Sequence, residues 1–448
     1  MENSENKPSR KNDENELSQK EMKLSTKGTE RIRLFPLIIL IILISIRFLY
    51  PILSMKNIEY GDDDYTFHTI AVRIYETGNV IDNFSFYYMD ILISLFAAGL
   101  YKIFGVNHFY VILFNSIFSL ISLFLLFGIV RAISVDRRIY LPALFLVVLY
   151  PIRYLKIQRR IFSENLYIPL LITIVWLGIS LVESEWAGKR RKELVNFLLI
   201  IVASSLLFWA RQTALIVWAA FMIYYSFFSP RRIREKVILL SIYLFFSFLL
   251  ISPMFWLTYK KFGHPTLFVK SSGVNLYLGN NPEATGELYY PKRDYFGEYI
   301  SSRYNSKKQD ISVEQRETLL KEYVLCYIKE DPLRWLCQTF AKLRMAVLTT
   351  SKIPLFSLII FLLAMIGLLS PRLNSGKYLL SLVILFHMVP IVIFFYNSRY
   401  RAVYEPFLAV MAAAGLITVW DFCKKKKSVV EVNSLHNFNK FSQLQKKC

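Results

Sequence analysis

Long apolar runs separated by short basic clusters constrain this chain more than any other feature. Of its 448 residues, 54% are apolar and only 19% are charged, a balance typical of membrane proteins and not of soluble domains. A helix of about 20 apolar residues spans a bilayer. The pattern therefore predicts an all-α polytopic membrane protein with about ten transmembrane helices. The predicted spans are residues 34–53, 109–130, 141–151, 166–182, 194–209, 214–228, 237–257, 354–369, 378–396 and 403–422.

The basic clusters predict how the chain is oriented. The first 33 residues are polar and are expected to form a disordered cytoplasmic tail. With that tail inside, almost every tight basic cluster falls in the cytoplasm, as the positive-inside rule requires. This holds only if the short apolar segment 89–104 lies in the membrane interface and does not span. The net charge of +21 is then explained by anionic membrane lipids, and nucleic acid is not expected as a partner.

These patterns divide the chain into five parts. A cytoplasmic tail (1–33) precedes a transmembrane bundle (34–257) whose first outer loop covers 55–107. Residues 258–346 form the one sizeable water-facing segment, which is expected to be a small lid of short helices. Within it, an Asn-Asn-Pro turn follows a predicted short strand, and helical periodicity covers 312–328. Transmembrane helices (347–423) and a basic cytoplasmic tail (424–448) complete the chain.

Charged residues on the outer side are the candidates for function. Asp62, Asp63 and Asp64 follow the first predicted span, where carboxylates are costly to desolvate unless they have a task. A helix lying along the membrane surface is expected to start there. One basic cluster also falls outside, next to Glu164, and such a cluster suits the binding of a phosphate. Alternatively, the short span 141–151 is misplaced. The basic residues of this cluster are Arg153, Lys156, Arg159 and Arg160.

A series of short motifs resembles the GT-C superfamily of membrane glycosyltransferases, in particular its protein O-mannosyltransferase and lipid A aminoarabinose transferase branch. The motifs occur in the family's order and cover roughly residues 34–420. They are Asp63-Asp64-Tyr65 with Ala71 and Gly78, Phe104-Gly105 with Asn115, Tyr150-Pro151, Ser163-Glu164-Asn165, residues 275–282, and Arg399-Tyr400-Arg401 with Pro406.

The resemblance implies a GT-C bundle with juxtamembrane helices in the first outer loop. It also implies a polyprenyl-phosphate sugar donor, a lipid, glycan or protein acceptor, and a site on the extracytoplasmic face of the cytoplasmic membrane. Asp64 stands where the family has Glu, and Asp62 adds a third carboxylate. Which carboxylate does the chemistry therefore stays open.

Sugar transfer from a lipid phosphate needs a base for the acceptor and cations for the leaving phosphate. Asp63 is the expected base, with Asp64 as the alternative. Arg399 and Arg401 are the expected phosphate clamp, unless they only snorkel to the interface. Arg211 is a weaker third candidate. Glu164 is expected to orient the acceptor or the basic residues.

Several alternatives remain at this stage. A divalent cation is possible, held by Asp62, Asp64 and His68, although no cofactor is firmly implied. The four cysteines have no metal or redox spacing. A transporter or flippase of lipid-linked sugars would share the bundle and the outer charges, but should show paired broken helices. A ligase of lipid-linked sugars and a structural subunit are further alternatives.

Overall fold

The computed structural model describes residue 38 and residues 40–54, 62–83, 90–149, 152–265, 272–304, 313–348 and 354–445. These residues are mainly helical, and their only β pairing consists of two isolated bridges, Ser134 with Leu373 and Glu287 with Tyr396. The all-α prediction is confirmed. The predicted tail 1–33 lies outside the described residues, whereas the backbone of the predicted tail 424–448 continues helix α19 to Gln445.

Within the described ranges, six helices are long and apolar enough to cross a membrane. The chain therefore has the character of a multi-pass membrane protein. Four shorter apolar helices accompany them: Leu40–Leu53, α4 (Ile91–Phe104), α10 (Ala214–Phe228) and α16 (Pro354–Leu369). The six long helices are α5 (His108–Ile133), α8 (Glu164–Trp186), α9 (Arg190–Ala210), α11 (Ile233–Phe262), α17 (Gly376–Ile393) and the first half of α19 (Glu405–Gln445).

The predicted span at 141–151 is the least well matched. It corresponds to α6 (Tyr140–Leu149), which has 10 residues and is therefore only about 15 Å long, about half the hydrocarbon thickness. A second short helix, α7 (Ile152–Gln158), follows and carries Arg153 and Lys156 of the basic cluster, and Arg159 and Arg160 come directly after it. This segment cannot cross the bilayer as a single straight α6 helix.

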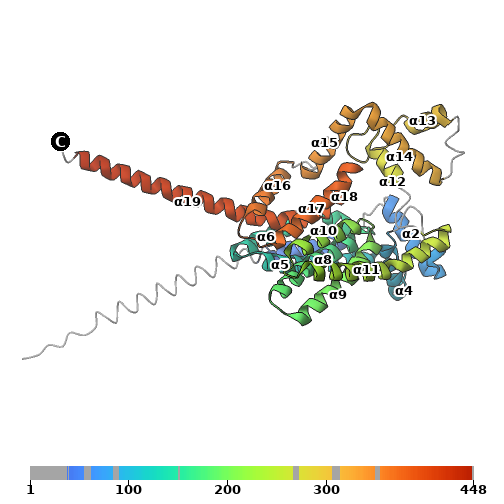
Figure 1. The fold of residues 1–448 in the computed structure, drawn as a ribbon, viewed down its shortest axis with the longest axis horizontal. Coiled ribbons are helices and arrows are strands. Elements are labelled where there is room, and N and C mark those ends of the chain that lie inside the picture. The colour runs from blue at the N-terminus through green and yellow to red at the C-terminus, as the bar shows by residue number, and fades with distance from the viewer. Residues whose placement is uncertain are drawn as a thin grey trace, which may run out of the picture.

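Helices pack around α8, of which 83% of the apolar window is buried. Helices α16 and α19 approach each other closely and lie side by side in Figure 1. A Cβ atom on Gly415 would lie 1.9 Å from the carbonyl oxygen of Leu363, and one on Gly367 would lie 2.0 Å from that of Met411. Only glycine permits this approach, so the two positions determine the helix spacing.

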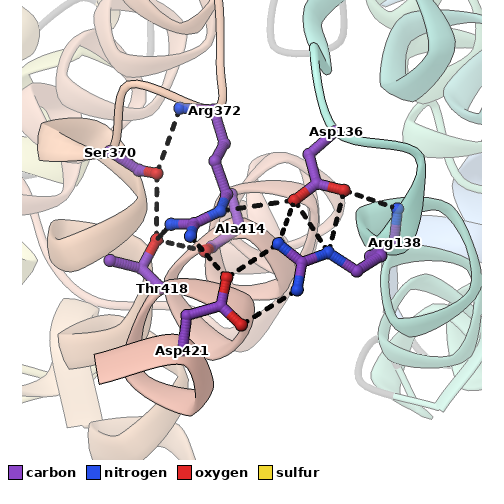
Figure 2. Close-up of polar contacts among 7 residues, drawn as sticks. All are labelled: Asp136, Arg138, Ser370, Arg372, Ala414, Thr418 and Asp421. Carbon is purple, nitrogen blue, oxygen red and sulfur yellow. Dashed lines mark hydrogen bonds and ion pairs between the residues drawn. The ribbon is translucent and has the colours of Figure 1, made fainter. Parts of the chain in front are cut away.

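The basic loops gather at one end of the bundle. Figure 2 shows the densest part, where Arg138 donates to both Asp136 and Asp421, and Arg372 donates to Asp421 at 2.6 Å. Neighbouring loops are joined to this end by further contacts. These are the Ser134–Leu373 bridge, the stacked rings of Phe228 and Tyr378, and the ion pairs of Arg231 with Glu185 and Glu193. The cytoplasmic clusters predicted from the sequence therefore share one end.

Within 272–348, the described residues 272–304 and 313–348 form a small unit with a core of its own, drawn in yellow and orange in Figure 1. It comprises α12 (Ser272–Gly279), α13 (Tyr295–Tyr304), α14 (Val313–Glu330) and α15 (Pro332–Leu348). We call residues 272–348 the outer segment. The helix predicted over 312–328 is confirmed for its described residues, which belong to α14.

The strand predicted before the Asn-Asn-Pro turn is wrong, because this stretch is helix α12. Its last carbonyl groups accept hydrogen bonds from two asparagine side chains. Asn280 Nδ2 donates to Leu276 O at 2.8 Å, and Asn281 Nδ2 donates to Tyr277 O at 2.9 Å. These bonds satisfy carbonyls that a helix C-terminus otherwise leaves unpaired. The same asparagines signalled a turn, but the turn ends a helix.

Candidate functional site

Arg399 holds two distant carboxylates together at the end of the bundle opposite the basic loops. Its Nη1 donates to Asp63 Oδ2 at 2.6 Å. Its Nε and Nη2 donate to Glu164 Oε1 and Oε2 at 3.0 and 3.1 Å, which makes this pair bidentate. Asp63 and Glu164 lie 336 and 235 residues from Arg399 in the sequence. The fold thus joins three residues that the sequence placed in three separate motifs.

Local structure explains how each of these side chains is presented. Asp63 lies in the first turn of α2 (Asp62–Thr77), and Glu164 is the first residue of α8. Carboxylates are favoured at helix N-termini, where backbone N–H groups point outward. Arg399 lies in the short helix α18 (Ser398–Ala402), whose N-cap Asn397 accepts a hydrogen bond from Arg399 N at 3.0 Å.

Arg211 extends the cluster from the end of α9. Its Nη1 donates to Glu164 Oε1 at 2.7 Å, and its Nε lies 3.8 Å from Asp90 Oδ2. Its guanidinium also lies 5.2 Å from the ring centroid of Tyr400, which suits a cation–π contact. Glu164, which is fully buried, therefore receives hydrogen bonds from two arginines. Glu164, Arg211 and Arg399 were all predicted as site residues.

Asp90 is a member of this cluster that sequence reasoning missed. It precedes α4, and its Oδ2 accepts a hydrogen bond from Ser163 Oγ at 2.9 Å. Burial raises its pKa to about 6, and this effect outweighs the opposing attraction of Arg211. In the sequence Asp90 lies near the start of the apolar segment 89–104 and was not selected as a site residue.

A second group of charged residues adjoins the first across the ring of Phe162. The Arg399 guanidinium lies 3.9 Å and that of Arg160 lies 5.8 Å from the centroid of this ring. Arg160 Nε is 3.8 Å from Asp64 Oδ2, and Asp64 is fully buried. Asp64 also acts on His68, because burial lowers the pKa of His68 and the nearby carboxylate opposes this effect. Phe162 was not predicted, since a phenylalanine in an apolar chain carries no signal.

The remaining predicted residues have other surroundings. Arg159 Nη2 donates to Ser54 O at 2.8 Å and thereby holds the end of the helix Leu40–Leu53. Arg153 lies on α7, but its side chain is outside the described part of the chain, as is that of Asp62. Among the described side chains, no group of three or more His, Cys, Asp and Glu residues could hold a metal ion. Asp64 and His68, which were considered as possible metal ligands with Asp62, therefore have no third ligand of these types among the described side chains.

Arg401, predicted with Arg399 as a phosphate clamp, makes structural contacts instead. It is fully buried, and its Nε donates to Glu405 Oε1 at 2.9 Å. Its Nη1 donates to the carbonyl oxygens of Ala346 and Val347, both at 2.8 Å. These bonds fasten the C-terminus of α15 to the start of α19. Two arginines of one motif, Arg399 and Arg401, therefore have different sets of partners.

Exposure decides which groups a ligand can reach. The side chain of Asp63 is 41% exposed and that of Arg160 is 37% exposed, whereas Arg399 is 20% exposed and Glu164 is fully buried. Asp63 is therefore an accessible carboxylate whose position is fixed by an arginine. Arg160, whose Nε lies 3.8 Å from Asp64 Oδ2, is more exposed than Arg399. Glu164 binds Arg399, and Arg211 in turn binds Glu164.

The fold and the cluster together define a multi-pass helical membrane protein with a polar site at the end of the bundle opposite the basic loops. Comparison of the chain with protein-family models, curated proteins and solved structures gives no match.

Proposed function

We propose that this protein is an integral-membrane glycosyltransferase that moves a sugar from a polyprenyl-phosphate donor to a lipid, glycan or protein acceptor. One observation carries the proposal. Asp63, Asp64, Glu164, Arg160, Arg211 and Arg399, which were all selected from the sequence, come from distant segments and join two adjacent clusters at one end of the bundle. Charged residues are costly to bury in an apolar chain, so their concentration at a membrane boundary indicates a functional site.

The reaction assigns a role to each group. The acceptor oxygen or nitrogen attacks the anomeric carbon of the donor sugar, and the bond from that carbon to the phosphate oxygen breaks. Asp63 accepts the proton from the acceptor, because it is exposed and held in one orientation by Arg399. The electron pair leaves with the polyprenyl phosphate, whose charge Arg160 stabilises.

The geometry favours a changed role for Arg399. Its three hydrogen bonds to Asp63 and Glu164 already use much of its donor capacity. We therefore assign it to orienting Asp63, and we assign the contact with phosphate to Arg160 and Lys156, which lie on or just after α7 and are more exposed. In this scheme Glu164 and Arg211 keep Arg399 in place.

The orientation follows from the distribution of basic residues. Because the basic loops share the other end of the bundle, that end is proposed to face the cytoplasm. The site would then open to the extracytoplasmic side of the cytoplasmic membrane, with the outer segment as a lid above it. About ten spans are part of this proposal. They are the six long helices, the shorter helices Leu40–Leu53, α10 and α16, and the predicted span 141–151, whereas α4 is proposed to lie in the membrane interface.

The test is turnover of purified protein with a panel of polyprenyl-phosphate sugars, measured as release of polyprenyl phosphate. Asp63→Asn keeps the shape of the side chain and removes its basicity, so the rate should fall by about 10²–10⁴-fold. Asp136→Asn, in the network at the opposite end (Figure 2), is the matched control and should retain turnover.

Three outcomes would change the assignment. Loss of activity in Asp64→Asn with full activity in Asp63→Asn would move the base by one residue. Full activity in both variants would refute the mechanism. Movement of intact lipid-linked sugar across a reconstituted bilayer, without release of the carrier phosphate, would identify a transporter instead.

A further inference from the structure

The position of Arg399 depends on a short irregular stretch between two helices. Helix α17 ends at Ile393 and α18 begins at Ser398. We call residues 394–397 the connector. Phe394 leaves the helix with φ −94° and ψ −95°, and Asn397 then caps α18. Arg399 is the second residue of α18, so a shift of the connector moves its guanidinium relative to Asp63.

The outer segment contacts the connector at several points. Tyr396 N donates to Gly286 O at 2.7 Å. A Cβ atom on Gly279 would lie 1.7 Å from Phe394 O, so the backbones of α12 and the connector touch directly. The side chain of Phe395 belongs to the small core of the outer segment. The outer segment therefore holds the connector, and Arg399, the second residue after the connector, belongs to the site.

Asn280 is the side chain that ties the two parts together. It is buried, and its Nδ2 donates to Ile393 O at 2.9 Å and to Leu276 O at 2.8 Å. Its Oδ1 accepts from Lys342 Nζ at 2.8 Å and from Trp335 Nε1 at 3.0 Å. Both donor hydrogens and both acceptor sites are used. The side chain thus joins α12, α15 and the last turn of α17.

We infer that Asn280 is a positioning residue, which transmits the arrangement of the outer segment to Arg399 and so to Asp63. Its Oδ1 is bound by Lys342 and Trp335 of the outer segment. Its Nδ2 binds the carbonyl oxygen of Ile393, the last residue of α17 before the connector. The kinetic part of this inference rests on the proposed function, whereas the structural link between Asn280 and the Asp63–Arg399 ion pair does not.

The discriminating variant is Asn280→Asp. An aspartate keeps the oxygen that accepts from Lys342 and Trp335, but it has no N–H for Ile393 O. The outer segment should stay folded, and the connector should be released. The matched control is Asn281→Asp, because Asn281 is equally buried and its Nδ2 donates only within α12, to Tyr277 O and Leu278 O.

Kinetics provide the first readout. Asn280→Asp should lower kcat by about tenfold or more with little change in KM for the donor, since small misplacements of catalytic groups are costly. Asn281→Asp should stay within about threefold of the wild type once protein amounts are matched. Equal losses in both variants would show that Asn280 acts only through the stability of the outer segment, and would overturn the inference.

A double-mutant cycle on thermal unfolding gives a second readout that needs no substrate. If Asn280 positions Arg399, the Tm loss caused by Asp63→Asn should be smaller in the Asn280→Asp background than in the wild type. In the Asn281→Asp background the losses should add. Additive losses with Asn280→Asp would refute the link. A clear coupling in a protein that turns over no polyprenyl-phosphate sugar would instead refute the proposed function and leave the link standing.

Discussion

Replacement of Glu164 by glutamine tests the site most directly. The change keeps the shape of the side chain and removes one negative charge from between two arginines. The new amide nitrogen would face a guanidinium that also donates, so at least one hydrogen bond is lost. We expect lower stability and loss of turnover together, because the same carboxylate supports the fold and holds Arg399 against Asp63.

The magnitude follows from the contacts. Glu164 is fully buried and accepts hydrogen bonds from Arg211 at 2.7 Å and from Arg399 at 3.0 and 3.1 Å. Breaking a buried ion pair costs about 3–5 kcal/mol. The lower figure applies here, since Arg399 keeps its contact with Asp63. With an unfolding entropy of about 0.9 kcal/mol/K for 448 residues, a loss of about 3 kcal/mol lowers Tm by about 3 °C.

The assay compares Glu164→Gln with Glu185→Gln in detergent-purified protein. Glu185 lies at the opposite end of α8 and accepts hydrogen bonds from Arg231 at 2.6 Å and from Tyr225 at 2.7 Å. Scanning fluorimetry should show a similar loss of Tm in both variants. Donor turnover should disappear only in Glu164→Gln. An unchanged Tm in Glu164→Gln, or equal turnover in the two variants, would refute the reasoning.

Three further predictions concern single residues. Burial raises the pKa of Asp90 from 3.8 to about 6. Its negative charge therefore destabilises the fold above pH 6 and not below about pH 4. The Tm of Asp90→Asn should exceed that of the wild type at pH 7.5, and the difference should shrink as the pH falls through 6. Gly415→Ala should lower stability by about 1–3 kcal/mol, seen as a lower Tm, because its methyl group would meet Leu363 O. Gly99→Ala is its control, because no described atom beyond the adjacent backbone of its own helix lies within 4 Å of the new Cβ. Arg401→Gln should lower Tm by about 3–5 °C through a broken buried ion pair, and an unchanged Tm would contradict its structural role.

Much of the fold follows from apolar periodicity. Runs of about 20 apolar residues predicted the long helices, because a segment in the bilayer must satisfy its backbone hydrogen bonds internally, and a helix does so. The errors fall where a few polar contacts decide. Helix α12 was predicted as a strand, since its end depends on bonds from Asn280 and Asn281 to carbonyls one turn earlier. Periodicity over so short a stretch does not distinguish the two structures.

The candidate site was predictable in part for a different reason. Charges in an apolar chain are conspicuous, so Asp63, Glu164 and Arg399 could be selected without knowledge of their contacts. What the sequence does not contain is their pairing. Arg399 and Arg401 look equivalent in one motif, but the turn of a short helix directs one to Glu164 and the other to Glu405. Such differences depend on side-chain direction in the folded state.

The sequence positions of the site residues also determine the order in which the site is assembled during synthesis. Glu164 is followed by Arg211 after 47 residues and by Arg399 only after 235. At translation rates of about 5–20 residues per second, the first partner emerges within roughly 2–9 s and the second after roughly 12–47 s. In that interval Arg211 is the arginine available to the carboxylate that α8 carries into the bundle. In a nascent chain that stops before residue 399, Glu164 has Arg211 as a partner, but Asp63 lacks the arginine that orients it in the complete chain.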